Sequence, residues 1–132
     1  MESTRRQFLI RAGVVAMAVL APTRLRAQGG HPNPRAGITA ANVLGRAELG
    51  DDREAIEVFD QVRQIPGIVD GIRCYCGCDE LPDHYSLLSC FERDGMARFC
   101  EICKGEAKLA FDMHRQNKSL AEIRTAIDKQ FG

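Results

Sequence analysis

The sequence CYCGC, residues 74–78, places three of the chain's six cysteines within five positions. In an extended chain, residues two apart have α-carbons about 7 Å apart, which is at or beyond the limit for a disulfide. Cys74 and Cys76 can therefore bridge each other only in a strained turn. The three thiols need three distant cysteine partners instead, or one ligand that they all approach. The compartment in which the protein works bears on that choice.

Residues 1–27 have the order of a secretory signal, with a polar start, an apolar run over residues 12–21 and a polar close. The apolar run is far shorter than the roughly 20 residues that span a membrane as a helix, so we expect no stable membrane span after cleavage. Arg5 and Arg6, followed by Gln, Phe and Leu, resemble a twin-arginine signal. We expect export by that route to a periplasmic or secreted location, with the general secretory route as the alternative.

The charge left after the signal argues against a nucleic-acid partner. Residues 1–27 hold five of the 18 basic residues and one of the 18 acidic ones, so the remainder carries 13 basic against 17 acidic side chains. No basic stripe survives to bind phosphates. Residues 28–50 begin with a stretch rich in Gly and Pro that has little to bury, and we expect them to be a linker, mostly disordered.

The remaining residues, 51–132, predict a small all-α domain of three to four helices. Apolar residues recur at three- and four-residue spacing over 53–65, and Pro66-Gly67 ends that pattern. Pro82-Asp83 can start a short helix that continues to residue 91, and residues 96–117 predict a long one. Ser119 and Glu122 form a capping box that opens a last helix. The apolar stripes expected in the core are Leu87, Leu88 and Phe91; Phe99, Ile102, Leu109 and Met113; Cys100, Cys103, Ala107 and Ala110; and Leu120, Ile123 and Ile127.

A domain of this size gains little stability from packing alone, and its cysteines are the obvious staples. An even number of cysteines in an exported domain favours disulfides. Cys100 and Cys103, however, lie three apart on a predicted helix and point at the same small region. Three closely spaced thiols that face such a pair form the kind of convergence that soft metal ions use. Gly77 would let the loop fold back on itself.

These residues carry a resemblance to a known family. CYCGC, His84, the cysteine of SLLSC and the later CEIC, taken over residues 56–130, resemble the exported bacterial proteins and lipoproteins named for the PCYCGC motif. The resemblance implies a metal-binding domain, and it carries over to Cys74, Cys76, Cys78, His84, Cys90, Cys100 and Cys103. Arg73 stands where the motif has proline. No cysteine precedes Cys74, so we expect a free periplasmic form without a lipid anchor.

His84 leaves two readings open. It is a metal ligand, or it is a histidine at a helix start that bonds to the backbone. If residue 84 already lay in a helix, Cys90 would lie about 120° away around the axis, and the two could not face one ion. His84 must therefore precede the first turn if it is a ligand. His114 is about 21 Å along the axis from Cys100 and belongs to no common site with it.

The function that we expect is storage, transport or sensing of a soft metal ion, with Cu(I) preferred and zinc or an iron–sulfur cluster as alternatives. The expected partners are that ion and a periplasmic protein. Three rival functions remain: iron–sulfur electron transfer, a thiol–disulfide redox protein that uses Cys100 and Cys103, and a structural domain held by three disulfides. No paired carboxylates, Ser/His/Asp arrangement or phosphate-binding loop indicates an enzyme of another class.

Overall fold

The computed structural model describes residues 30–132, and the expected signal peptide, residues 1–27, lies outside the described residues. The described part is helical, with no strand and one isolated bridge between Val43 and Glu92. This confirms the all-α fold. The α-helices are α1 (Arg46–Leu49), α2 (Arg53–Gln64), α3 (Pro66–Asp70), α4 (Glu101–Arg115) and α5 (Leu120–Phe131), joined in part by the short 3₁₀ helices η2 (Cys78–Glu80), η3 (Leu87–Phe91) and η4 (Ala97–Phe99).

Helix α2 forms as its apolar spacing predicts. The Asp52 side chain accepts a hydrogen bond from the amide of Ala55 at 3.0 Å and so caps the first turn. One face buries Ala55, Val58, Phe59 and Val62. The Phe59 ring meets the Phe91 ring of η3 edge to face, with centroids 4.8 Å apart. Pro66 ends the pattern by starting α3 in a new direction.

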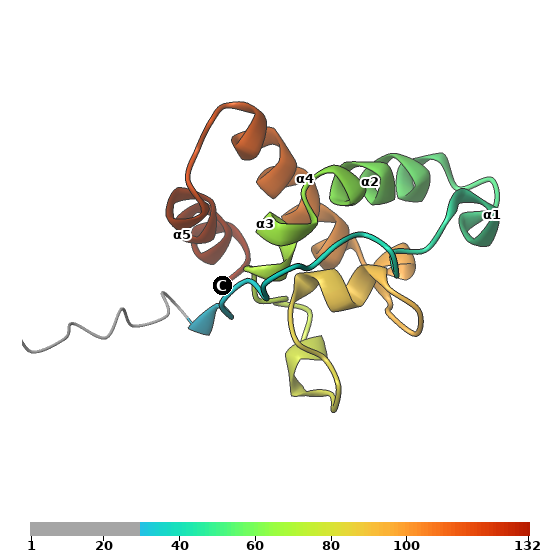
Figure 1. The fold of residues 1–132 in the computed structure, drawn as a ribbon, viewed down its shortest axis with the longest axis horizontal. Coiled ribbons are helices and arrows are strands. Elements are labelled where there is room, and N and C mark those ends of the chain that lie inside the picture. Colours follow the sequence, from blue (N-terminus) through green and yellow to red (C-terminus); the bar gives the residue numbers. More distant parts are fainter. Residues whose placement is uncertain (1–29) are drawn as a thin grey trace, which may run out of the picture.

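Helix α4 packs between α2 and α5 (Figure 1). The capping box of Ser119 and Glu122 that opens α5 is confirmed. The core face of α4 is the stripe of small side chains, because Cys103, Ala107 and Ala110 are fully buried. Of the stripe that starts at Phe99, Leu109 and Met113 pack against the core, but Phe99 and Ile102 were wrongly expected there. The helix begins only at Glu101, so Phe99 lies in η4, where it is 81 % exposed, and Ile102 is 41 % exposed.

The expected helix from Pro82 to residue 91 is reduced to η3. Asp83 has a φ of 67°, a left-handed conformation that an α-helix does not allow, and Ser86 is extended. The chain before η3 is therefore irregular. Figure 1 shows the yellow segment around residues 78–84 projecting from the helices. Within η3, Leu87, Leu88 and Phe91 are buried as expected.

Residues 30–50, expected to be part of a linker, pack against the helices. The segment starts beside the C-terminal end of α5 and crosses the molecule to α1 (Figure 1). His31 is 1 % exposed, and Val43 and Leu49 join the core. Arg35 forms a salt bridge with the fully buried Asp70 of α3 at 2.7 Å. Single buried residues between prolines and glycines have no periodicity, which is why the sequence pattern misses them.

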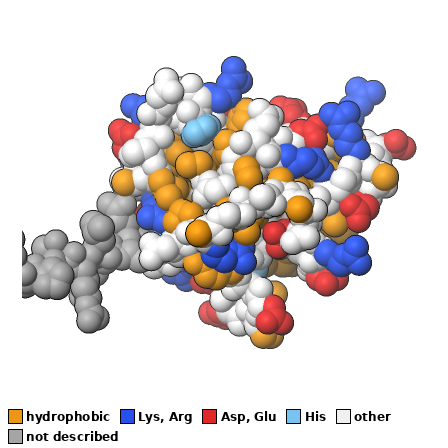
Figure 2. Space-filling view, in the orientation of Figure 1, with side chains coloured by type: hydrophobic (Ala, Val, Ile, Leu, Met, Phe, Trp, Pro, Cys, Tyr) orange, Lys and Arg blue, Asp and Glu red, His pale blue; other side chains and the backbone are white. Residues whose placement is uncertain are grey.

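The surface carries both signs of charge. Figure 2 shows acidic and basic side chains interspersed around the edge of one face, with hydrophobic side chains between them. Among the described residues, no helix is long and apolar enough to cross a membrane.

Candidate metal centre

The CYCGC loop folds into a turn that brings its three sulfur atoms together. Gly77 has a φ of 91°, a left-handed conformation that glycine adopts without strain. The Sγ atoms of Cys74 and Cys76 lie 3.1 Å apart, and those of Cys76 and Cys78 lie 2.7 Å apart. The thiols thus face one another, and the turn supplies a ligand set within five residues.

Two further elements complete what we call the inner group: Cys74, Cys76, Cys90 and Cys103. All four sulfur atoms lie within 4.8 Å of one another. Cys103, in the first turn of α4, places its sulfur 3.4 Å from that of Cys74 and 3.5 Å from that of Cys76. Cys90 comes from η3. Three of the four side chains are buried, and Cys76 is partly exposed.

A second set, which we call the outer group, consists of Cys78, His84 and Cys90. His84 precedes η3, and its Nε2 lies 3.1 Å from the sulfur of Cys90. His84 therefore precedes the first helical turn, as a metal ligand at this position must. Met96, which the sequence pattern did not single out, places its sulfur 2.9 Å from that of Cys78. These side chains line a surface cavity of about 280 Å³.

Cys100 belongs to neither group. It is the N-cap of α4, and its sulfur accepts a hydrogen bond from the amide of Cys103 at 3.5 Å. The sequence treated the two cysteines as a helical pair, but α4 starts one residue after Cys100. The structure therefore brings together six of the seven residues expected at the site.

No two of the six cysteine sulfurs are joined by a disulfide bond in this structure. The shortest distance between two cysteine sulfurs is the 2.7 Å between Cys76 and Cys78, whereas a disulfide bond is about 2.0 Å long. Sulfurs that are gathered without a covalent bond leave their lone pairs available to a thiophilic ion.

Hydrogen bonds and burial within the inner group shift the pKa values of its thiols in opposite directions. Hydrogen bonds from Cys103 and Cys90 hold the pKa of the Cys74 thiol far below its usual value. The pKa of Cys103 is raised in turn, mainly because it donates to Cys74. Burial, followed by the hydrogen bond with Cys78, raises the pKa of Cys76. One thiolate with protonated neighbours is a set that a cation enters by displacing protons.

Glu106 supports the loop from α4. It is fully buried, and its carboxylate accepts a hydrogen bond from the amide of Tyr75 at 2.9 Å. Burial, and next the charge of Cys74, raises the pKa of Glu106 to about 9. Glu106 lies three residues after Cys103 on the buried face of α4. A carboxylate on a stripe of small buried residues is the signal that could have identified it from the sequence.

The N-terminal segment holds the other side of the loop. The amide of Arg73 donates to Nδ1 of His31 at 2.9 Å, and Nε2 of His31 lies 2.8 Å from the carboxylate of Asp128 in α5. The Arg73 side chain bonds Asp79 at 2.8 Å. The residues just before and after the first cysteine are therefore fixed by partners far away in the sequence.

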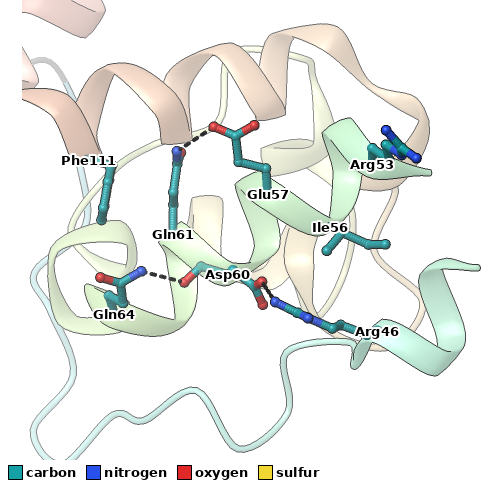
Figure 3. Close-up of a pocket in the computed structure, with 8 residues that line it drawn as sticks. All are labelled: Arg46, Arg53, Ile56, Glu57, Asp60, Gln61, Gln64 and Phe111. Atoms are coloured by element: carbon teal, nitrogen blue, oxygen red, sulfur yellow. Dashed lines mark hydrogen bonds and ion pairs between the residues drawn. The ribbon is translucent and has the colours of Figure 1, made fainter. Parts of the chain in front are cut away.

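A separate pocket beside α2 contains none of these residues (Figure 3). Its polar side chains bond one another: Arg46 forms a salt bridge with Asp60 at 2.5 Å, and Gln61 donates to Glu57 at 3.4 Å. It contains no cysteine or histidine. The sulfur groups are therefore the stronger candidate site.

Comparison with known proteins identifies a family for this chain. The model of a family described as proteins of unknown function with a PCYCGC motif matches residues 38–132. No curated protein and no solved structure matches. The match includes every residue of the inner and outer groups, and Arg73 takes the place of the proline in the motif. The chain belongs to the PCYCGC-motif family.

Proposed function

We propose that this protein is exported and binds a soft metal ion, with Cu(I) preferred, for storage, transport or sensing. The observation that carries the proposal is the inner group, in which four sulfur atoms from the CYCGC loop, η3 and α4 lie within 4.8 Å of one another.

The donor set supports a soft ion. The inner group is made of sulfur alone, and thiolates favour Cu(I), zinc and iron–sulfur clusters over magnesium or calcium. Sulfurs bound at about 2.3 Å around a tetrahedral ion lie about 3.8 Å apart. Three of the distances within the group are 3.1, 3.4 and 3.5 Å, so an outward movement of a few tenths of an ångström accommodates an ion.

Cu(I) is preferred because the sulfur-rich surroundings extend beyond the inner group. Cys78 and Met96 add a thiol and a thioether at 2.9 Å from each other. A thioether is a ligand of soft ions, whereas zinc sites in proteins use thiolate, imidazole and carboxylate. These additional donors suit a protein that carries a thiophilic ion.

Zinc is the second candidate, because four thiolates in tetrahedral arrangement form a closed structural zinc site. The inner group alone fits that description. An iron–sulfur cluster also needs four thiolates. A visible absorption spectrum of protein purified without oxygen identifies a cluster, and metal analysis of the same sample identifies zinc.

The test of metal binding compares two cysteines of the same helix end. The full-length protein, reduced and free of oxygen, is titrated with Cu(I) against a coloured competing chelator, and free thiols are counted by alkylation. We expect Cu(I) to protect thiols. Cys103→Ser should lose affinity because it removes an inner-group sulfur, whereas Cys100→Ser should retain it. Serine is also a good N-cap, so this control preserves α4.

Two results would refute the proposal: three mapped disulfides with no bound metal, or equal loss of affinity in the two variants. Zinc that displaces Cu(I) from the protein, so that the coloured Cu(I) complex of the chelator increases, would favour the structural zinc site instead.

Export rests on Arg5 and Arg6 and is tested separately. Changing both to Lys should leave the precursor in the cytoplasm, because a twin-arginine signal requires the pair. The control changes Arg24 and Arg26, which lie beyond the apolar run, to Lys. Processing of the Arg5/Arg6 variant at the normal rate would indicate the general secretory route.

A further inference from the structure

We propose that the outer group, extended by Met96, is a second metal site that faces the solvent and shares the Cys90 sulfur with the inner group. It would take a soft monovalent ion such as Cu(I) or Ag(I). This inference rests on the proposed function and adds to it a path by which ions enter and leave.

The shared residue is the first observation. Cys90 is the one described residue that belongs to both sulfur-containing groups. A thiolate can bind two ions at once, and two ions that share a sulfur at about 2.3 Å each lie no more than about 4.6 Å apart. The sulfurs of Cys76 and Cys78, 2.7 Å apart, bring the groups together at a second point. The two groups therefore form one continuous set of donors.

The exposure of the donors differs between the groups. Cys74 and Cys103 of the inner group are fully buried, whereas Met96 is 48 % exposed and His84 is partly exposed. The outer donors line the cavity of about 280 Å³ that opens to the surface. The outer group therefore reaches the surface through Met96 and His84, whereas the inner group reaches it only through the partly exposed Cys76.

His84 is free to act as a ligand. Its Nε2 faces Cys90, and its Nδ1 is buried without a hydrogen-bond partner among the described residues. A histidine that serves only to hold a loop would bond the backbone or a nearby side chain. His31 shows that arrangement in the same protein, because both of its ring nitrogens are engaged.

The backbone places Met96 at the cavity. A turn closes with the amide of Gly95 donating to the carbonyl of Glu92 at 2.9 Å, and Asp94 in that turn has a φ of 68°. Gly95 packs so closely on Cys90 that a Cβ atom there would clash with the Cys90 carbonyl. The turn therefore directs the Met96 sulfur to Cys78, although the side chain is half exposed.

The chemistry of the cavity selects the ion. Its ligands are a thioether, an imidazole and two thiols, a set suited to Cu(I) and Ag(I). Asp83 and Asp94 also line the cavity, opposed by Arg93, and they provide negative charge near the entrance. The outer site would accept and release the ion, and the buried inner site would retain it.

The test uses two methionines of the described part of the chain, Met96 as the probe and Met113 as the control. The full-length protein, carrying ¹³C-methyl methionine, is reduced and titrated with Ag(I), and native mass spectrometry counts the bound ions. We expect a second ion to shift the Met96 methyl signal, assigned with Met96→Leu, while the Met113 signal stays in place. Met96→Leu should weaken binding of the second ion at least about tenfold, and Met113→Leu should leave it unchanged.

A second pair of variants checks the imidazole. His84→Gln should also weaken the second ion, whereas His114→Gln, on an exposed position of α4, should not. A protein that binds one ion tightly, with Met96 and His84 unaffected, overturns the outer site and leaves the proposed function standing. A protein that binds no ion tightly refutes the proposed function itself. Equal effects of the Met96 and Met113 variants overturn the role of Met96.

Discussion

Replacing Arg73 by proline restores the PCYCGC sequence of the family motif and should nevertheless destabilise this chain. The Arg73 amide donates to Nδ1 of His31, which is 1 % exposed. Proline has no amide hydrogen, so the variant leaves a buried acceptor without its donor. Loss of one partner of a buried hydrogen bond costs about 1–3 kcal/mol. Proline recovers about 0.4–1 kcal/mol by restricting the unfolded chain.

Arg73→Ala is the matched control, because it keeps the amide and removes the same side chain. That side chain makes a partly exposed salt bridge with Asp79 and lies over the Tyr75 ring at 5.2 Å. Exposed interactions of these kinds contribute about 0.2–1 kcal/mol each. The proline variant should therefore be about 1–2 kcal/mol less stable than the alanine variant, as the difference between the lost hydrogen bond and the proline gain.

Urea unfolding of the reduced protein, followed by far-ultraviolet circular dichroism, measures this difference. With a slope of about 1–3 kcal/mol per molar for a small domain, the midpoint should fall by about 1 M from alanine to proline. In a His31→Ala background the deficit of the proline variant should disappear because the acceptor is gone, and the proline gain should leave it about 0.4–1 kcal/mol more stable than the alanine variant. A proline variant as stable as the alanine variant would refute the reasoning, and so would a deficit of the proline variant that persists without His31.

Three further outcomes are expected. His31→Ala should lower the free energy of unfolding by about 3 kcal/mol, because it creates a cavity and leaves the Arg73 amide unpaired; His114→Ala should change it by less than about 0.5 kcal/mol. Burial lowers the pKa of His31 from 6.5, and the nearby Arg124 and Arg73 add to this against Asp128. Its contribution to stability is therefore complete above pH 6.5 and is lost as the pH falls through the lower folded pKa. Thermal unfolding from pH 8 to 5 measures this loss, and His31→Ala should remove the dependence of stability on pH that His31 causes. Gly95→Ala should cost about 1–3 kcal/mol and weaken metal binding because its methyl group clashes with Cys90, whereas Gly67→Ala in α3, with no atom closer than 4.0 Å, should be neutral or stabilising in the same assays.

The sequence predicted the elements whose signals are local. The spacing of apolar residues predicted α2, and the Ser119 capping box predicted the start of α5. The segment before η3 was wrongly expected to be helical because a polar residue such as Asp83 carries no sign of its left-handed backbone. Its conformation is a property of the folded loop, and propensity alone does not predict it.

At the candidate site, too, local sequence signals were predictive and long-range contacts were missed. Crowding within CYCGC indicated convergence, and the structure groups six of the seven expected residues. Met96, Glu106 and His31 were missed because each acts through a contact with a residue at least 18 positions away. Cys100 was expected to lie beside Cys103 on one helix, but α4 begins at Glu101 and Cys100 is its N-cap. Boundaries are the least reliable part of a sequence prediction, and here one boundary decides the role of a side chain.

Three thiols in five residues have a physical use that a pair of thiols lacks. The turn at Gly77 lets Cys74 and Cys76 enter the inner group while Cys78 enters the outer group. Because the loop serves both groups, an ion in one changes the charge on sulfurs next to the other. Two cations that share Cys90 repel each other, yet each also neutralises thiolates that would otherwise repel. Because each ion displaces protons from the thiols that it binds, filling of the first site should leave the shared Cys90 sulfur as a thiolate that attracts the second ion, and the two ions should bind in closely spaced steps rather than exclude each other.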